Sequence, residues 1–300
     1  MEQKYKQMTE PPVSKLICKL AVPCIISMLV TAFYNMADTY FVGMLKSNAA
    51  TGAVGVVFSM MAIIQAVGFF FGQGSGTFIS RALGQKNIRE AEEMAATGFF
   101  VSMAIGAMIC VLGLIFLEPL SYLLGSTDTI LPYTKDYLSV ILLGAPWIVS
   151  SFVLNNQLRF QGGAFYAMIG ISTGGLINIV LDPIFIFALG LGTAGAAIAT
   201  AISQFISFSI LLFMCNRKPD AIAISPRNFK PTPGMYFRIF YTGFPSLGRQ
   251  GIASISTILL NTAAGVYGDA AIAAMSIVTR FIMFINSSVI GFGQGFQPVC

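Results

Sequence analysis

The chain has 300 residues, of which 56% are hydrophobic and only 10% are charged, whereas soluble globular proteins carry about 25% charged residues. This composition argues against a soluble enzyme, and the lack of histidine excludes imidazole catalysis, histidine metal sites and serine–histidine triads. A net charge of +5 in so apolar a chain is typical of basic loops beside a membrane. We therefore expect no nucleic-acid partner.

Apolar runs recur along the chain, each long enough to cross a hydrocarbon core about 30 Å thick at about 1.5 Å per helical residue. The predicted fold class is all-α, a polytopic membrane protein in contact with lipid. Eight membrane helices are predicted, at residues 16–44, 51–80, 95–117, 133–157, 164–189, 193–215, 235–263 and 271–298.

Lysine and arginine residues fall unevenly on the predicted connections. Thirteen of the 17 lie before the first helix or near the second, fourth and sixth connections, whereas only Lys46 and Lys135 lie near the others. Because cytoplasmic loops accumulate positive charge, the N-terminus is predicted to be cytoplasmic.

The seventh and eighth predicted helices repeat the first and second. LAVPCII at Leu20 matches TGFPSLG at Thr242, and GFFFGQGSG at Gly68 matches IGFGQGFQ at Ile290. Two copies separated by six helices imply a parallel repeat. The predicted organisation is a six-helix N-terminal lobe (1–216), a cytoplasmic linker (217–234) and the first two helices of a second lobe (235–300). The repeat also predicts that the chain is C-terminally truncated relative to a protein of six plus six helices.

Two carboxylates occur inside predicted membrane helices. Asp38 lies in FYNMADTYFVG of the first helix, and Asp182 lies in GLINIVLDPIFIF of the fifth. A charged side chain at the middle of a membrane costs at least ~3 kcal/mol, so buried acids are functional candidates that usually face a cavity. Counting back from the predicted outer helix ends places Asp38 roughly 9 Å and Asp182 roughly 10 Å deep. We therefore expect both acids at one level.

Other oxygen-bearing side chains are predicted at this level. Asn178 precedes Asp182 by four residues, which places both on one helix face, and Thr200 lies about seven residues into the sixth helix. Oxygen ligands suit a hard cation such as Na⁺, whereas paired carboxylates in a low-dielectric cavity can carry a proton, so either ion fits. Pro183 removes a helical hydrogen bond and can free a carbonyl as a further ligand or hinge. Further polar residues are expected nearby as cavity or substrate residues: Tyr137, Asn156 and Asn35, with Arg249 and Arg280 of the second lobe.

A simpler interpretation stays open for these acids: neighbouring amides and hydroxyls satisfy each of them, and they only specify helix packing. Equal depth favours the functional interpretation. Arg249 and Arg280 lie in the seventh and eighth helices without a nearby acid in the sequence, so they either pair with helices beyond this chain or line an aqueous path. The glycine-rich GQGSGT follows no strand and lacks a following GK[ST], which indicates close helix packing rather than a phosphate loop.

Several motifs occur in an order that resembles the multidrug and toxic compound extrusion (MATE) family, especially its MepA-like and DinF-like branches. They are P-x-x-I-x-x-x-L-x-x-x-x-Y-N-x-x-D, FFGQGSGTFISRALGQKN, LRFQGG and LINIVLDPIFIF. The resemblance implies two six-helix lobes in a V around a cavity, and a monomeric plasma-membrane antiporter without a cofactor. It implies export of organic cations and drugs driven by inward Na⁺ or H⁺. The cation site that it implies consists of Asp38, Asn178, Asp182 and Thr200, which would also be the Na⁺ ligands.

One departure from the family pattern concerns the second lobe. Some members carry a coupling glutamate about ten positions after the glycine of the GFP motif, where this chain has Ala253. Coupling is therefore expected to rest on the first lobe. Two alternatives stay open: a lipid-linked oligosaccharide flippase of the same superfamily, for which only Arg249 and Arg280 offer cavity charge, and an intramembrane aspartyl protease, whose Gly-x-Gly-Asp motif is missing.

Overall fold

The computed structural model describes residues 11–45, 48–217, 222–265 and 269–299, and within them the side chains of all except 48–51, 253–255 and 257–281. Every regular element in this part of the chain is helical, which confirms the predicted fold class. The helices are α2 (Val13–Gly43), α3 (Asn48–Gly84), α4 (Ile88–Ile115), α5 (Leu117–Leu123), α6 (Leu131–Phe160), α7 (Ala164–Pro183), α8 (Gly192–Arg217), α9 (Pro233–Gly265) and α10 (Asp269–Phe296), with a π-helical turn η1 (Ile184–Ala188) and a 3₁₀ turn η2 (Pro226–Asn228).

Six helices are long and apolar enough to cross a membrane within the described residues: α2, α3, α4, α6, α7 with η1, and α8. They correspond to the six spans predicted for the first lobe. The seventh and eighth predicted helices are present as α9 and α10, but the described apolar part of α10 extends only over Ile282–Phe296. The short helix α5 was not predicted, because its seven residues are too few for a periodic pattern.

Helix α6 forms the centre of the six-helix bundle and packs against α3, α4, α7 and α8. Glycines on α3 allow the closest approach: a Cβ atom at Gly72 would lie 2.8 Å from the Asn156 amide, and one at Gly76 would lie 2.3 Å from the Phe160 ring. These separations are too short for any larger residue. The predicted role of the GQGSGT segment in close helix packing is therefore confirmed.

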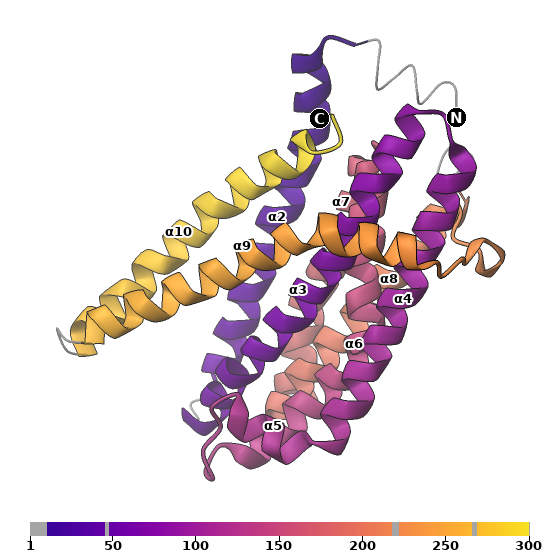
Figure 1. Cartoon of the computed structure of the whole chain (residues 1–300). Helices are drawn as coiled ribbons and strands as arrows, with labels where there is room; N and C mark the ends of the chain where they lie inside the picture. Colours follow the sequence, from indigo (N-terminus) through magenta and orange to yellow (C-terminus); the bar gives the residue numbers. More distant parts are fainter. Residues whose placement is uncertain (1–10, 46–47, 218–221, 266–268, 300) are drawn as a thin grey trace.

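Helices α9 and α10 attach to the bundle through two related contacts. Helix α9 packs on α3 and α10 packs on α2, and Figure 1 shows both leaning away from the bundle toward the left of the view. A Cβ atom at Gly74 would lie 2.4 Å from the Ile239 carbonyl oxygen, and one at Gly295 would lie 2.4 Å from the Ala21 Cα. Gly74 and Gly295 end the two GQG copies, so the repeated sequence makes an equivalent close contact in each copy. The boundaries predicted for the lobes and linker stay predictions.

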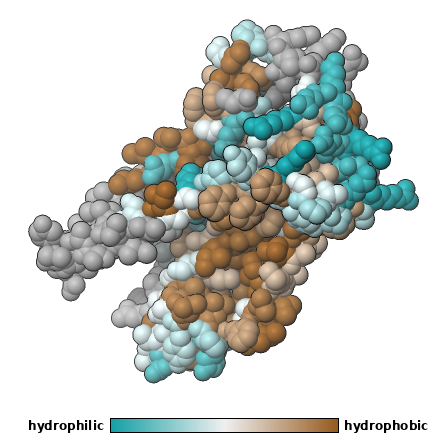
Figure 2. Space-filling model, viewed as in Figure 1, coloured by the Kyte–Doolittle hydropathy of each residue, from teal (hydrophilic) through white to brown (hydrophobic). Residues whose placement is uncertain are grey.

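Hydrophilic residues gather at the end of the bundle where α4 begins, and an apolar band covers its middle (Figure 2). At the hydrophilic end, Lys230 pairs with Glu93 and Arg238 pairs with Glu90. The Ile222 amide donates a 2.9 Å hydrogen bond to the Gln161 side chain. These contacts hold the described part of the predicted linker and the start of α9 against α4 and the end of α6. The cytoplasmic assignment of this end stays a prediction.

Candidate functional site

The last turn of α7 positions Asp182, one of the two predicted carboxylates. Asp182 is fully buried, and α7 ends at Pro183, immediately after it. Because proline has no N–H to donate, the helix continues as the wider turn η1, where the Leu189 amide bonds to the Ile184 carbonyl oxygen at 2.9 Å. The predicted irregularity at Pro183 is therefore present as a π-helical turn.

Three of the predicted site residues form one hydrogen-bonded cluster. The Asn178 amide nitrogen donates to Asp182 Oδ1 at 3.1 Å and lies 3.4 Å from Thr200 Oγ1, within hydrogen-bonding distance. All three side chains are buried. The spacing of four residues on α7 aligns the amide and the carboxylate, and the packing of α7 on α8 brings the hydroxyl to them.

The other predicted carboxylate, Asp38, belongs to α2. Asp38 lies within electrostatic range of Asp182 and of the buried Tyr137 on α6, and Tyr137 also interacts with Thr200. Helices α2 and α7 pack along each other. The structure therefore brings together five residues that the sequence placed at one depth.

Several oxygens of this cluster are buried without a hydrogen-bond partner among the described residues: Asp38 Oδ1, Asn178 Oδ1 and Asp182 Oδ2. A buried acceptor without a partner loses free energy relative to the same group in water. A cation or a proton supplied to two such carboxylates would compensate for that loss. The donor set is all oxygen, which suits a hard cation such as Na⁺.

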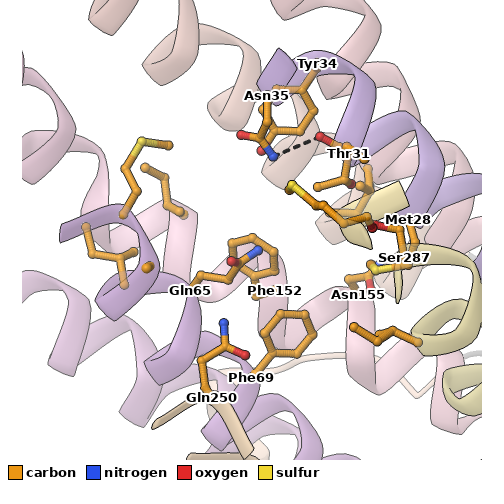
Figure 3. Close-up of a pocket in the computed structure, with 18 of the residues that line it drawn as sticks. Met28, Thr31, Tyr34, Asn35, Gln65, Phe69, Phe152, Asn155, Gln250 and Ser287 are labelled. Atoms are coloured by element: carbon orange, nitrogen blue, oxygen red, sulfur yellow. Dashed lines mark hydrogen bonds between the residues drawn. The ribbon is translucent and has the colours of Figure 1, made fainter. Parts of the chain in front are cut away.

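A cavity of about 290 Å³ lies beside this cluster, with residues of α9 and α10 on one side and of α2, α3, α6, α7 and α8 on the other. In Figure 3 the rings of Phe69 and Phe152 and the amide of Gln65 face its interior. Asn35 also lines it, with its amide bonded to the Thr31 carbonyl oxygen at 2.9 Å. The wall is therefore mostly apolar, with a few amides and hydroxyls, as ligand pockets usually are.

The remaining predicted residues lie in different places. Asn35 and Arg249 line the cavity, whereas Tyr137, expected there too, is buried on α6 and absent from the described cavity lining. Asn156 does not: it is fully buried, donates to the Phe152 carbonyl oxygen at 2.7 Å and accepts a hydrogen bond from Arg159. The expectation that Asn156 belongs to the cavity is corrected by this placement, because the Gly72 contact holds it in the α3–α6 interface. Arg280 lies in α10, and its side chain is outside the described residues.

Sequence reasoning missed two polar residues. Arg159, which the charge pattern assigned to a connection, is only 1% exposed in the last turn of α6 and bonds to Gln294 of α10. Gln204 lines the cavity one turn after Thr200 on α8. The spacing of four residues from Thr200 was the available signal for Gln204, whereas the burial of Arg159 depends on the packing of α10, which no local pattern reveals.

Comparisons with known proteins agree with this architecture. The MatE family model matches residues 23–184, more than half of the chain. The multidrug export protein MepA of Staphylococcus haemolyticus (strain JCSC1435) is 31% identical over 97% of this chain and 64% of its own length. MepA of Staphylococcus aureus (strain MRSA252) is 31% identical over 99% of this chain and 66% of its own length. The chain thus spans slightly less than two thirds of these relatives.

Solved structures of MATE and MOP superfamily transporters also share this helix arrangement. A MATE crystal structure in complex with MaL6 superimposes with a TM-score of 0.92 at 30% identity, over 98% of this chain and 66% of that one. A MOP superfamily transporter from Pyrococcus furiosus, described as having a binding pocket of reverse polarity that suggests a different function, gives 0.89 at 30% identity, over 97% and 64%. Helix arrangement, motif order and family match coincide, so the chain belongs to the MATE family.

Proposed function

We propose that this chain acts in the plasma membrane as a cation-coupled antiporter, which exports small-molecule drugs and organic cations by alternating access and takes up Na⁺ or H⁺ in exchange. The observation that carries the proposal is that Asp38 and Asp182, from separate helices, lie within electrostatic range of each other and have buried oxygens that lack partners among the described residues. The names of the MepA relatives support drug export. We further propose that the protein acts as a monomer.

The ion site and the cavity share helix α2, which offers a route for coupling. Tyr34 and Asn35 line the cavity, four and three residues before Asp38. Residues at these spacings lie on one helix face, so an ion held by Asp38 and Asp182 would change the position or hydrogen bonding of two cavity residues. Such an ion shifts the equilibrium between two conformations only if it prefers one of them. Antiport requires the drug to prefer the other.

The arrangement of α9 and α10 supports alternating access. Close glycine contacts with the bundle, among them those at Gly74 and Gly295, lie toward the end where α4 begins, and both helices lean away from the bundle beyond these two contacts (Figure 1). If that end is cytoplasmic, as the charge distribution predicts, α9 and α10 diverge from the bundle toward the outer side. Rocking of α9 and α10 about the two glycine contacts would then open the opposite side.

The experiment that tests the proposal is efflux of a fluorescent organic cation from vesicles containing the protein, with the Na⁺ and pH gradients imposed separately. One of the gradients is expected to drive efflux, and Asp38→Asn is expected to abolish it without loss of folded protein. Asp136→Asn is a matched control, because Asp136 is exposed at the start of α6. Undiminished efflux by well-expressed Asp38→Asn protein would refute the ion site.

A lipid-linked oligosaccharide flippase is the second candidate. The specific observation in its favour is Arg249, which lines the cavity and could meet a phosphate. Transport of a fluorescent lipid across vesicles, without drug efflux, would favour it. The intramembrane aspartyl protease hypothesis is set aside, because the family to which the chain belongs consists of transporters.

A further inference from the structure

The cavity beside the ion site carries one kind of charge. Among the described residues that line it, the only charged side chain is Arg249 of α9, and none is an aspartate or glutamate. Arg249 is exposed, and none of the described residues forms a salt bridge with it. A guanidinium group in a mostly apolar wall without carboxylates is a site for an oxyanion, since it can donate two parallel hydrogen bonds to one carboxylate or phosphate.

A second guanidinium group adds to the positive potential. Arg159 lies behind Gln294, a residue of the cavity wall, and bonds to the neutral side chains of Gln294 and Asn156. Arg159 and Arg249 are within electrostatic range of each other, and the described residues place no carboxylate against Arg159. Low-dielectric surroundings strengthen such a field. This part of the cavity therefore favours negative charge.

We propose that the cavity binds amphipathic molecules through a negatively charged group, with the oxyanion at Arg249 and the apolar body against Met28, Phe69 and Phe152. This inference rests on the proposed transport function and names the substrate class of its cavity. Asp38 of the ion site follows Tyr34 and Asn35 of the cavity wall by four and three residues on α2, and Asp182 lies within electrostatic range of Asp38. A zwitterion with its oxyanion at Arg249 and its cationic group toward these acids satisfies both ends. The favoured substrates are therefore carboxylate-bearing organic cations rather than simple cations.

A pair of dyes that differ in one charge tests this proposal. Rhodamine 110 carries a free carboxylate beside its cationic ring system, and rhodamine 123 is its methyl ester. Binding of each to the purified chain in detergent is measured by fluorescence anisotropy at constant ionic strength. We expect rhodamine 110 to bind about tenfold more tightly, which corresponds to about 1.4 kcal/mol. Equal binding of the two dyes, or tighter binding of the ester, would overturn the proposal.

Variants then assign the preference to one residue. Arg249→Gln is expected to remove the difference between the dyes, and Arg249→Lys is expected to retain part of it, because lysine keeps the charge but loses the two-pronged geometry. Arg217→Gln is the control, since Arg217 lies at the end of α8 against Phe213, outside the cavity wall. A preference that survives in folded Arg249→Gln protein contradicts the assignment; thermal unfolding verifies folding.

The same assay separates this inference from the proposed function. Asp38→Asn is expected to abolish ion-driven efflux and to leave the preference for rhodamine 110 intact, because both dyes carry the same cationic ring system and differ only in the group that meets Arg249. If efflux depends on Asp38 while the two dyes bind equally, the ion site stands and the anion site fails. If the dye preference depends on Arg249 while Asp38→Asn transports normally, the reverse holds.

Discussion

Asn178 links α7 to α8 at the proposed ion site, since its amide lies within hydrogen-bonding distance of both Asp182 and Thr200. The amide nitrogen is thereby used as a donor, while Asn178 Oδ1 is buried without a partner among the described residues. We propose that this oxygen is available to the coupling ion.

Thr200→Val tests this role at the scale of a single hydroxyl. Valine keeps the shape of threonine but cannot bond to Asn178, so we expect affinity for the coupling ion to fall about tenfold. The free energy of unfolding should change by only about 1 kcal/mol, as for one neutral hydrogen bond. Ion-dependent thermal stability measures the first effect. Thr39→Val is the control, because Thr39 is exposed and bonds to its own helix; an equal loss in both variants would contradict the role of Thr200.

At this scale, sequence reasoning succeeded where helical spacing sufficed. The interval of four residues aligned Asn178 with Asp182, and the depth count brought Thr200 to them, both of which agree with the geometry. The same reasoning placed Asn156 in the cavity, but its side chain is held by Arg159. Depth alone does not determine which face of α6 a residue occupies, because α6 is covered by neighbouring helices on nearly all sides.

At the scale of elements, the two glycine contacts determine how α9 and α10 join the bundle. Gly74→Ala is expected to destabilise the fold by about 1–3 kcal/mol, because the added methyl group would meet the rigid Ile239 backbone at 2.4 Å. Gly55→Ala on the same helix is the control: nothing lies within 4 Å of the new Cβ atom, so stability should stay constant or rise by up to about 1 kcal/mol. Urea or thermal unfolding compares them, and equal stability of both variants would contradict the contact.

Helices were predictable from apolar length, whereas the form of their ends was not. Pro183 indicated an interruption in the fifth predicted helix, and the structure shows η1 there. The short helix α5 and its neighbourhood depend on local contacts such as the Lys135–Glu118 ion pair. Packing of α9 on α3 could not be predicted from hydropathy, because it depends on where Gly74 of α3 meets Ile239 of α9, 165 residues later in the sequence.

At the scale of the whole molecule, Arg159 and Gln294 connect the six-helix bundle to α10 through a buried hydrogen bond. Gln294→Leu should destabilise the protein by about 1–3 kcal/mol, because it leaves a buried guanidinium group with one partner fewer. In a double-mutant cycle with Arg159→Leu, the two losses should differ from additivity by at least about 1 kcal/mol. Thermal unfolding of the four proteins measures this coupling. Strict additivity would show that the contact does not join the two parts.

The central claim is that Asp38 and Asp182 together hold the coupling ion. The most direct measurement is the unfolding temperature of the purified chain, titrated with Na⁺ at constant ionic strength and, separately, with pH. An ion that binds only the folded protein at 100 times its dissociation constant stabilises it by about 2.7 kcal/mol. We predict that one of the two ions stabilises the wild type and Asp136→Asn, and that both Asp38→Asn and Asp182→Asn lose this response. A full response in either of the latter variants, or no response of the wild type to either ion, would contradict the account.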